Sequence, residues 1–478
     1  MAKMTIDGTP TEAKGGKTLE VRNPATGEVV DSVPRAAKAD VDAAVEAAHK
    51  AFPAWASIAA PKRAQLLHAA AQKVREAVPE IARLLTLEQG KTIRESTIEA
   101  GRVAANLEYF AGLADKIRGD YVTLEDPSLM GFTIKRPLGV AVAITPWNFP
   151  LTLMANKIAP ALAAGNTVVL KPASTTPLAT QRAVDAINSA GLPKGALNTV
   201  HGPGGEIGDA LVSHPLVRKI AFTGQTETGK RIMRLAADNV ARVTLELGGS
   251  DACIICDDAD LEKAARAVAI GRFFNAGQAC LAVKRLYVFK EVAEAFMELI
   301  AGRAKKLKVG NGMSEGAMMG PLHTEKQRAE VEAQVADAVK RGARVLTGGK
   351  RPEGAEFEKG WFLEPTVLAD VPEDSRMITE EVFGPALPIV IVDGLDAAIL
   401  KANSSIYGLG SSIWTRDIAR ARLAAERIEA GYTWVNAIQI AHDELPFGGV
   451  KQSGFGKEHG IEALDSYLEK KSVVLATA

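Results

Sequence analysis

The spacing of apolar residues divides the chain into a first part of helices and a later part of short strands. The segment VRNPATGEVV predicts two short strands joined by a turn at its Asn-Pro and Gly residues. A helix is expected next, capped by Asp40, with apolar residues at helical spacing as far as Phe52 and with Pro53 after its end. Further helices rich in alanine and leucine are predicted to about Ala114.

From Gly139 onward, short apolar strands alternate with helical segments. The strand-like segments are GVAVAIT, TVVLK, LNTVHG, RKIAFTG and VTLELGG, and a second series from about Gly249 contains RLYVF, RVLTGG, LPIVIV and GSSIWT. Strands that are apolar on both faces and separated by helices indicate an α/β protein with a parallel, doubly wound sheet. A strand pair is also expected over residues 121–136, and SYLEKKSVVLATA is expected to form a strand or tail.

Length, charge and cysteine content narrow the class of protein. A chain of 478 residues suits two or three domains. Lys+Arg and Asp+Glu both number 57, so charge gives no reason to expect nucleic acid or an anionic membrane as a partner. The three cysteines, the absence of a signal-peptide pattern and the lack of an apolar run near ~20 residues predict a cytoplasmic protein.

Four residues stand at or just after the ends of predicted strands, where open α/β sheets bind their ligands. They are Asn148, Lys171, Gly224 and Glu246. A partly desolvated Glu246 would have the raised pKa of a general base, although an ordinary solvated glutamate fits the sequence as well. Asn148, flanked by Pro146 and Pro150, is either an oxyanion donor or an ordinary turn residue.

Lys171 and the turn FTGQTETG suggest a nucleotide. Lys171 is either a contact to a ribose or a surface lysine. The turn supplies Gly224 and Gly229 at a predicted strand-to-helix junction, and a helix N-terminus attracts phosphate. Because the turn is not the GxGxxG fingerprint, it is a weak signal by itself.

The three cysteines carry different expectations. Cys253 and Cys256 form CIIC, and because no second CxxC or histidine pair completes a metal site, we expect both in the core. The histidines show no metal-ligand spacing, so no metal is expected. Cys280, in FFNAGQACLAVKR, is either a buried small hydrophobe or a nucleophile, which needs an accessible thiolate.

Taken together, the motifs resemble those of the aldehyde dehydrogenase superfamily. TPWNFP, LKPAS, FTGQTETG, LELGG, FFNAGQAC and EEVFGP occur in the family's order and approximate spacing. The resemblance runs from VRNPATGEVV to PFGGVKQSGFGKEHG, which is essentially the whole chain. Each motif is moderately specific, whereas their ordered combination is highly specific.

The resemblance implies that Cys280 is the nucleophile and attacks an aldehyde to give a thiohemiacetal. Asn148 and the backbone N–H of Cys280 match the donors that stabilise the oxyanion, and removing one such donor typically costs about 10²–10³ in rate. Hydride transfer to a nicotinamide leaves a thioester, and Glu246 matches the base that activates water to hydrolyse it. The expected product is the carboxylic acid.

The resemblance also implies a path for NAD or NADP. Its positions are Thr145, Pro146, Trp147, Lys171, Ser174, Gly204, Gly224, Gln225, Leu247, Glu381 and Phe383. Glu381 matches the residue that holds the nicotinamide ribose, Phe383 the aromatic beside the cofactor, and Lys171 the adenosine-ribose contact.

Two departures from the family pattern concern this path. Ser174 stands where many NAD-specific members have an acidic residue, and a serine removes a charge that repels a 2′-phosphate, so we predict that NADP is accepted. Gln225 stands where the family usually has serine near the cofactor phosphates. Its amide either still binds them or alters the pose of the cofactor.

The family's architecture implies a division of the chain. We expect residues 1–119 and 138–248 to form a Rossmann-like cofactor-binding domain and residues 249–445 to form a second, catalytic α/β domain. Residues 120–137 and 446–478 are expected to form a small β element for oligomerisation. The resemblance therefore predicts a homodimer or homotetramer.

The substrate is left open among small semialdehydes, hydroxyaldehydes, aliphatic aldehydes and aromatic aldehydes. The succinate-semialdehyde dehydrogenases resemble one another in an arginine after TPWNFP that holds the substrate carboxylate, and the matching position here is Asn156. This difference argues against strong selection for a carboxylate. Lys284, Trp434 and the segment AIQIAHDE are expected to line the entrance instead.

Two other functions compete with a hydrolytic dehydrogenase. Acylating relatives pass the thioester to coenzyme A, but they generally lack the base that Glu246 matches. A catalytically silent structural or binding protein on the same scaffold would have no need of Cys280, Glu246 and Asn148 together.

Overall fold

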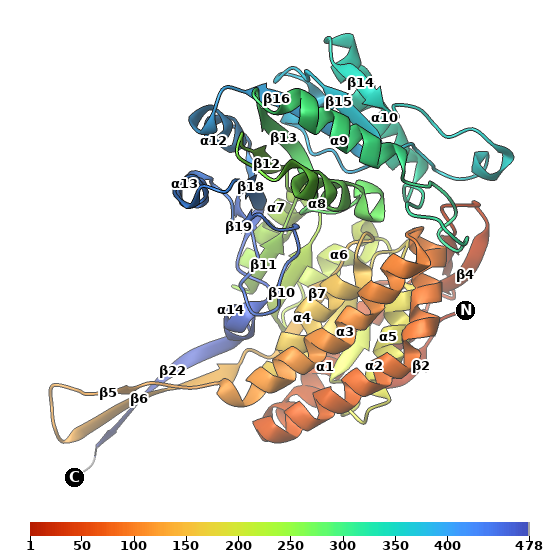
Figure 1. Cartoon of the computed structure of the whole chain (residues 1–478). Coiled ribbons are helices and arrows are strands. Elements are labelled where there is room, and N and C mark those ends of the chain that lie inside the picture. The colour runs from red at the N-terminus through yellow and green to blue at the C-terminus, as the bar shows by residue number, and fades with distance from the viewer. Residues whose placement is uncertain (477–478) are drawn as a thin grey trace.

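The computed structural model describes residues 1–476, and two large sheets organise it (Figure 1). The first sheet has six strands in the order β21-β11-β10-β7-β8-β9, and the second has seven in the order β14-β15-β16-β13-β12-β18-β19. Neighbouring strands run parallel except at β21 and β14, which are antiparallel edge strands. The expected α/β class with doubly wound parallel sheets is confirmed.

The strands of the two large sheets have the following bounds. The first contains β7 (Val140–Ile144), β8 (Thr167–Lys171), β9 (Leu197–Thr199), β10 (Val217–Thr223), β11 (Arg242–Glu246) and β21 (Gly454–Phe455). The second contains β12 (Asp251–Ile255), β13 (Val283–Phe289), β14 (Arg344–Thr347), β15 (Thr366–Ala369), β16 (Ala386–Val392), β18 (Gly410–Trp414) and β19 (Tyr432–Val435).

Small sheets and helices complete the described chain. The small sheets pair β1 (Met4–Ile6) with β2 (Thr9–Thr11), β3 (Thr18–Arg22) with β4 (Val29–Pro34), β17 (Tyr407–Gly408) with β20 (Val450–Lys451), and β6 (Leu129–Pro137) with both β5 (Tyr121–Val122) and β22 (Leu468–Ala476). The helices up to β11 are α1 (Lys38–Ser57), α2 (Ala60–Gln89), α3 (Ile93–Leu113), η1 (Ala114–Lys116), α4 (Pro150–Ala164), α5 (Leu178–Asn188), α6 (Gly204–Val212) and α7 (Thr226–Ala237). The later helices are α8 (Leu261–Phe273), η2 (Phe274–Gly277), α9 (Ala293–Lys305), α10 (Glu325–Lys340), η3 (Ala355–Phe357), α11 (Arg376–Thr379), α12 (Leu395–Asn403), α13 (Ile418–Arg427) and α14 (Gly460–Asp465).

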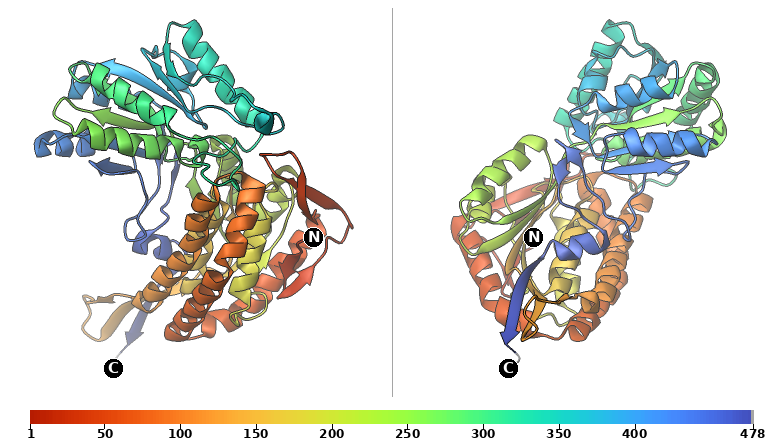
Figure 2. Two further views of the ribbon diagram at one scale, coloured as in Figure 1. Left: turned by 45° about the vertical axis from the view of Figure 1, so that its right-hand side comes forward. Right: turned by 90° about the vertical axis from the view of Figure 1, so that its left-hand side faces the viewer.

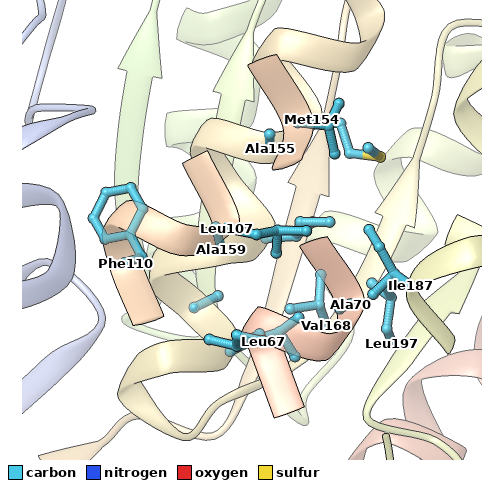
Figure 3. Packing of buried hydrophobic residues seen from close by; sticks show 14 of the residues in the cluster. Leu67, Ala70, Leu107, Phe110, Met154, Ala155, Ala159, Val168, Ile187 and Leu197 are labelled. Atoms are coloured by element: carbon cyan, nitrogen blue, oxygen red, sulfur yellow. The ribbon is translucent and has the colours of Figure 1, made fainter. Parts of the chain in front are cut away.

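Alternating side chains of the central strands enter cores on opposite faces of the first sheet. In β7, Ala141 and Ala143 pack with α2 to α5, whereas Val140, Val142 and Ile144 pack with α1, α6 and α7. Figure 3 shows the first of these cores, where Leu107 and Phe110 of α3 approach Ala155 and Ala159 of α4. Burial on both faces explains why these strands are continuous apolar runs in the sequence.

The second sheet is built in the same way. Ile254 lies in the core on one face, and its neighbours Cys253 and Ile255 lie in the core on the other. Cys253 and Cys256 are both buried and unpaired, so the structure places CIIC in the core as expected. Of the strands in this sheet, β15 and β19 have only four residues each and carried no sequence signal of their own.

The first long helix differs from its prediction. It begins at Lys38 and continues to Ser57, so Pro53 lies inside it, and Ala37 rather than Asp40 is its N-cap. Asp40 instead accepts a hydrogen bond at 2.9 Å from the backbone N–H of Ala37. Packing of the buried face, which ends at Trp55, outweighs the local cost of the proline.

A three-stranded sheet of β5, β6 and β22 projects away from both large sheets (Figures 1 and 2). The expected strand pair at 121–136 and the expected C-terminal strand thus lie together, although residues 477–478 of the predicted tail lie outside the described residues. Within 446–478, β21 joins the six-stranded sheet and β22 joins the projecting sheet. The division into domains stays a prediction.

Within residues 1–476, no helix is both long and apolar enough to cross a membrane.

Candidate active site

Four adjacent strands of the first sheet end at one edge and bring the expected residues together. Lys171 is the last residue of β8, Glu246 the last of β11, and Gly224 follows β10 directly. The loop to Asn148 leaves the same edge from β7. The parallel pairing of β8, β7, β10 and β11 makes this coincidence a consequence of topology.

The segment that carries Cys280 has an unusual backbone. Asn275 and Ala276, at φ of 52° and 53°, and Gly277, at φ of 73°, all adopt the left-handed conformation. A side chain at Gly277 would come within 2.3 Å of the Gly384 carbonyl oxygen, so this position requires glycine. Gln278 holds the turn in place, because its side chain accepts from the backbone N–H of His323 at 2.8 Å and donates to the backbone carbonyl of Asn275 at 2.9 Å.

Asn148 is held directly beside this segment. Its side-chain amide donates to the carbonyl of Gln278, two residues before Cys280, at 3.1 Å. The backbone carbonyl of Asn148 accepts from the Lys91 ammonium at 2.7 Å and from the side-chain amide of Asn275 at 3.0 Å. The second amide hydrogen of Asn148 has no partner in the described chain. An amide fixed in this way is suited to stabilise an oxyanion.

Cys280 is partly exposed and lies among charged groups. Burial raises the pKa of its thiol to about 12, Lys284 opposes this rise, and Glu246, Asp251 and Glu381 add to it. Lys284 is fully buried, donates to the Cys280 carbonyl at 3.2 Å and pairs with Glu381. The expectation that Lys284 lines the entrance is wrong, because its ammonium lies inside the protein, where it is the cation that favours a thiolate.

Glu246 is a buried carboxylate for which neither oxygen has a hydrogen-bond partner among the described residues. Burial raises its pKa well above the ordinary value, and the neighbouring Glu458 adds to the rise, while Lys157 and Lys457 oppose it. Its charge also acts on the Cys280 thiol, so the two groups are close. When it is ionised, a carboxyl group with a raised pKa and unused acceptor atoms is a stronger base toward water than an exposed glutamate.

Aromatic side chains join the two large sheets beside these groups. Trp147, from the loop after β7, stacks on His323 with ring centroids 4.5 Å apart and meets Phe383 edge-on at 5.7 Å. Lys284 lies 5.0 Å from the centre of the Phe383 ring. Glu381 accepts from the backbone N–H of Gly249 at 3.2 Å. The site therefore lies between the sheets, with residues from both.

A second group of expected residues lies along the same edge. Lys171 is buried, has the Pro172 carbonyl at 3.2 Å as its one acceptor within residues 1–476, and has its pKa lowered by burial to about 8. The surface alternative for this lysine is wrong. Ser174 donates to the Gly202 carbonyl at 3.3 Å, and exposed Gly204 begins α6. Thr145 is buried and its hydroxyl has no partner in the described chain.

The start of α7 lies between these two groups. Gly224 has no room for a side chain, because a Cβ there would lie 2.4 Å from the Phe222 ring. Gln225 is the N-cap of α7, yet its exposed side chain makes no capping bond. Leu247 is buried and fills the space beside Gly229. The free backbone N–H groups at this helix start suit a phosphate.

The sequence did not identify the residues that support Asn148 and Glu246. Lys91 pairs with Glu99, and Glu99 accepts from the backbone N–H groups of Leu151 and Thr152 at 2.9 and 3.3 Å. Beside Glu246, Lys157 pairs with Glu458 and donates to Thr223 at 2.7 Å. These pairs span 8 to 301 positions, so no local pattern indicates them.

The fold and this site define an α/β protein in which a partly exposed cysteine lies near a buried carboxyl group between two largely parallel sheets. Comparison with known proteins names the family. The aldehyde dehydrogenase family model matches residues 11–473, and the chain belongs to that family. The expected enzyme class is thereby confirmed.

Individual relatives agree with this assignment. The chain is 41% identical to glutarate-semialdehyde dehydrogenase of Pseudomonas aeruginosa, over 98% of this chain and 96% of that protein. It is 40% identical to the NADP⁺ succinate-semialdehyde dehydrogenase GabD of Escherichia coli, with the same coverage. The solved structure of betaine aldehyde dehydrogenase from Staphylococcus aureus with NAD⁺ matches at a TM-score of 0.97 and 38% identity, over 100% of this chain and 95% of that chain. The expected use of NAD or NADP is in line with both relatives.

Proposed function

We propose that Cys280, Asn148 and Glu246 carry out the oxidation of a small aldehyde to its carboxylic acid, with NAD or NADP as the oxidant. The observation that carries this assignment is the buried Glu246 carboxylate, which has no partner in the described chain and acts on the Cys280 thiol. A buried carboxylate without hydrogen bonds is costly, and a role in accepting a proton explains why it is kept.

In the first step, the Cys280 thiolate forms a bond to the aldehyde carbon. The carbonyl π electrons move to oxygen, and the oxyanion accepts hydrogen bonds from the free Asn148 amide hydrogen and the backbone N–H of Cys280. Lys284 is the buried cation beside Cys280 that stabilises the thiolate.

The cofactor fits the edge of the first sheet. Lys171 and Ser174 would hold its adenosine end, the N–H groups at the start of α7 its phosphates, and Glu381, Trp147 and Phe383 its nicotinamide end. The nicotinamide supplies the hydride acceptor when it is bound. The tight glycine at position 224, where a Cβ would meet Phe222, leaves the backbone open to close approach.

In the last step, Glu246 takes a proton from water, and the resulting hydroxide attacks the carbonyl carbon of the thioester. The C–S bond breaks, and the Cys280 thiolate leaves as the carboxylic acid is released. The raised pKa of Glu246 makes its ionised carboxylate a stronger base than that of an exposed glutamate.

A panel of aldehydes tests the proposal. We expect absorbance of reduced cofactor with both NAD and NADP, and free acid as the product. Acyl-CoA formed in the presence of coenzyme A would instead support the acylating alternative. No reduced cofactor with any aldehyde would overturn the proposed function and favour a structural protein on this scaffold.

Substitution of Ser174 by glutamate tests the cofactor proposal. A carboxylate there repels a 2′-phosphate, so kcat/KM for NADP should fall by about 10-fold or more, while that for NAD changes less. Ser174→Gln is the matched control, because glutamine has the same size without the charge. Equal losses with both cofactors in Ser174→Glu would contradict a 2′-phosphate next to this position.

We also propose a homodimer or homotetramer, in which the projecting sheet of β5, β6 and β22 contacts another subunit. Its support is the exposure of large apolar side chains on that sheet, among them Tyr121 at 69% and Val474 at 58%. Light scattering of the native protein should give a dimer or tetramer, and Val474→Asp should give a smaller species. A monomeric native protein would contradict this proposal.

The cytoplasmic location stays a prediction, supported by three unpaired cysteines.

A further inference from the structure

An apolar wall beside Cys280 leads to a charged pair that the mechanism does not use. Leu409, Trp434 and Phe447 form a small apolar cluster, and Cys280, Leu281, Tyr432 and Ala441 pack against it. Phe447 meets His459 edge-on, with ring centroids 6.2 Å apart. His459 in turn contacts Asp443 through Nδ1 at 3.0 Å, and Asp443 pairs with Arg102 of α3. One side chain, that of His459, thus connects the pair to the apolar cluster beside Cys280.

Of the two carboxylate oxygens of Asp443, Oδ1 is the one that accepts hydrogen bonds within the described chain. Its Oδ1 accepts from Arg102, from His459 and, at 3.4 Å, from the Asn106 amide. Burial favours its neutral form, but the hydrogen bond from His459 and the charge of Arg102 lower its pKa below the ordinary value. Its second oxygen, Oδ2, has no partner in the described chain. Asp443 is therefore a carboxylate with one acceptor atom left over.

Arg102 complements this arrangement. Its side chain is 37% exposed, against 9% for Asp443, and only its Nη2 contacts the carboxylate. Its Nε and Nη1 have no partner among residues 1–476. The pair consequently offers a donor edge and an acceptor edge at the same place, with no net charge.

The surroundings disfavour a carboxylate at this place. Asn156, at the position of the substrate arginine of the succinate-semialdehyde dehydrogenases, is buried and hydrogen-bonded to Glu458, His459 and Asn106 at 3.0, 3.0 and 3.3 Å. Asp443, Glu444 and Glu462 all act on Tyr109, which lies about two helical turns from Arg102 on α3, so several carboxylates gather here. A carboxylate ligand would gain Arg102 but meet these like charges.

We propose that Arg102 and Asp443 form a recognition site for the far end of the substrate, and that this site selects aldehydes with a neutral hydroxyl tail. A hydroxyl both accepts from Arg102 and donates to Asp443, whereas a carboxylate or an ammonium satisfies only one of them and is repelled by the other. This inference rests on the proposed function and names the substrate class of the same site.

Three para-substituted benzaldehydes test it, because the rigid ring prevents the tail from cyclising onto the aldehyde. They are 4-(hydroxymethyl)benzaldehyde, 4-formylbenzoate and 4-methylbenzaldehyde. For the native enzyme we expect kcat/KM to be about 10-fold or more higher with the hydroxymethyl compound than with the other two. In Arg102→Met this advantage over the methyl compound should disappear.

Asp443→Asn changes the charge and keeps the shape. Because Arg102 is then no longer neutralised, the ratio of kcat/KM for 4-formylbenzoate to kcat/KM for 4-methylbenzaldehyde should rise by about 10-fold, and any measurable oxidation of either compound reports a folded enzyme. Asp393→Asn is the matched control, since Asp393 is 87% exposed and pairs with Lys290 at the surface. It should leave all three values unchanged.

The outcomes separate the two proposals. A native enzyme that prefers 4-formylbenzoate, or that oxidises other aldehydes but none of these three, overturns the tail site and leaves the proposed function standing. An unchanged ratio of kcat/KM for the hydroxymethyl compound to kcat/KM for the methyl compound in Arg102→Met also overturns the tail site. Because Arg102 is partly exposed, this variant tests the proposal even if Asp443→Asn does not fold. Failure to oxidise any aldehyde overturns the proposed function instead.

Discussion

Replacing Cys280 by alanine should abolish the oxidation of every aldehyde, with a loss of at least about 10³-fold in kcat. Without the thiolate there is no thiohemiacetal, and hydride transfer from a free hydrated aldehyde lacks the oriented carbon–sulfur adduct. Asn148 and Lys284 do not contact the lost sulfur in the described bonds, so their positions should persist. The measurement is absorbance of reduced cofactor at saturating aldehyde.

Cys256→Ala is the control for this experiment. Cys256 is fully buried in the core of the second sheet, so it has no path to substrate. That variant should lose some stability and keep its kcat. Full activity in Cys280→Ala would remove the nucleophile assignment, and mass spectrometry showing a substrate adduct on Cys256 would transfer it.

Replacing Glu246 by glutamine should separate the two halves of the reaction. Acylation of Cys280 does not need the base in the hydrolytic step, so the first turnover should release about one reduced cofactor per active site as a burst. Steady-state kcat should then fall by about 10²–10⁴, because water is no longer activated and the thioester accumulates. Stopped-flow absorbance measures the burst, and mass spectrometry of the quenched protein measures the acyl group on Cys280.

The pH dependence of the native enzyme adds to this test. Glu246 acts as a base only when it is ionised, and its pKa is raised by burial, so hydrolysis should increase as pH rises through that raised value. This limb should be absent in Glu246→Gln. Glu353→Gln is the matched control, since Glu353 is 86% exposed and pairs with Lys350. A Glu246→Gln variant with native kcat and no burst would show that another group activates the water.

Local motifs predicted the residues at the strand ends well. Lys171, Gly224 and Glu246 are each within one residue of a strand end, and the parallel order of β8, β7, β10 and β11 brings them to one edge. No single motif specifies the order of the strands within the sheet. That order follows from the helices that cross over between parallel strands, and the burial of β7 on both faces, visible in its apolar sequence, indicated a parallel sheet.

Long-range contacts were beyond the sequence pattern. Lys284 appeared as a polar residue four positions after Cys280, yet it is buried and paired with Glu381, 97 positions away. Asn156 was identified as a missing arginine, but its commitment to Glu458 and His459 depends on the C-terminal segment folding back onto α4. Bringing residues together over such separations costs chain entropy, and only the packing of the complete core offsets that cost.

The sequence by itself determined the α/β class, the order of the strands along the chain, the family resemblance and the three residues proposed for the chemistry. These depend on local periodicity and short motifs, which act over a few residues. The tertiary structure decided which charges surround those residues: the buried Glu246 without a partner, the Lys284 cation at Cys280, and the Arg102–Asp443 pair beyond Phe447. Burial and electrostatic fields depend on everything packed within a few ångströms, so they arise only when distant segments meet.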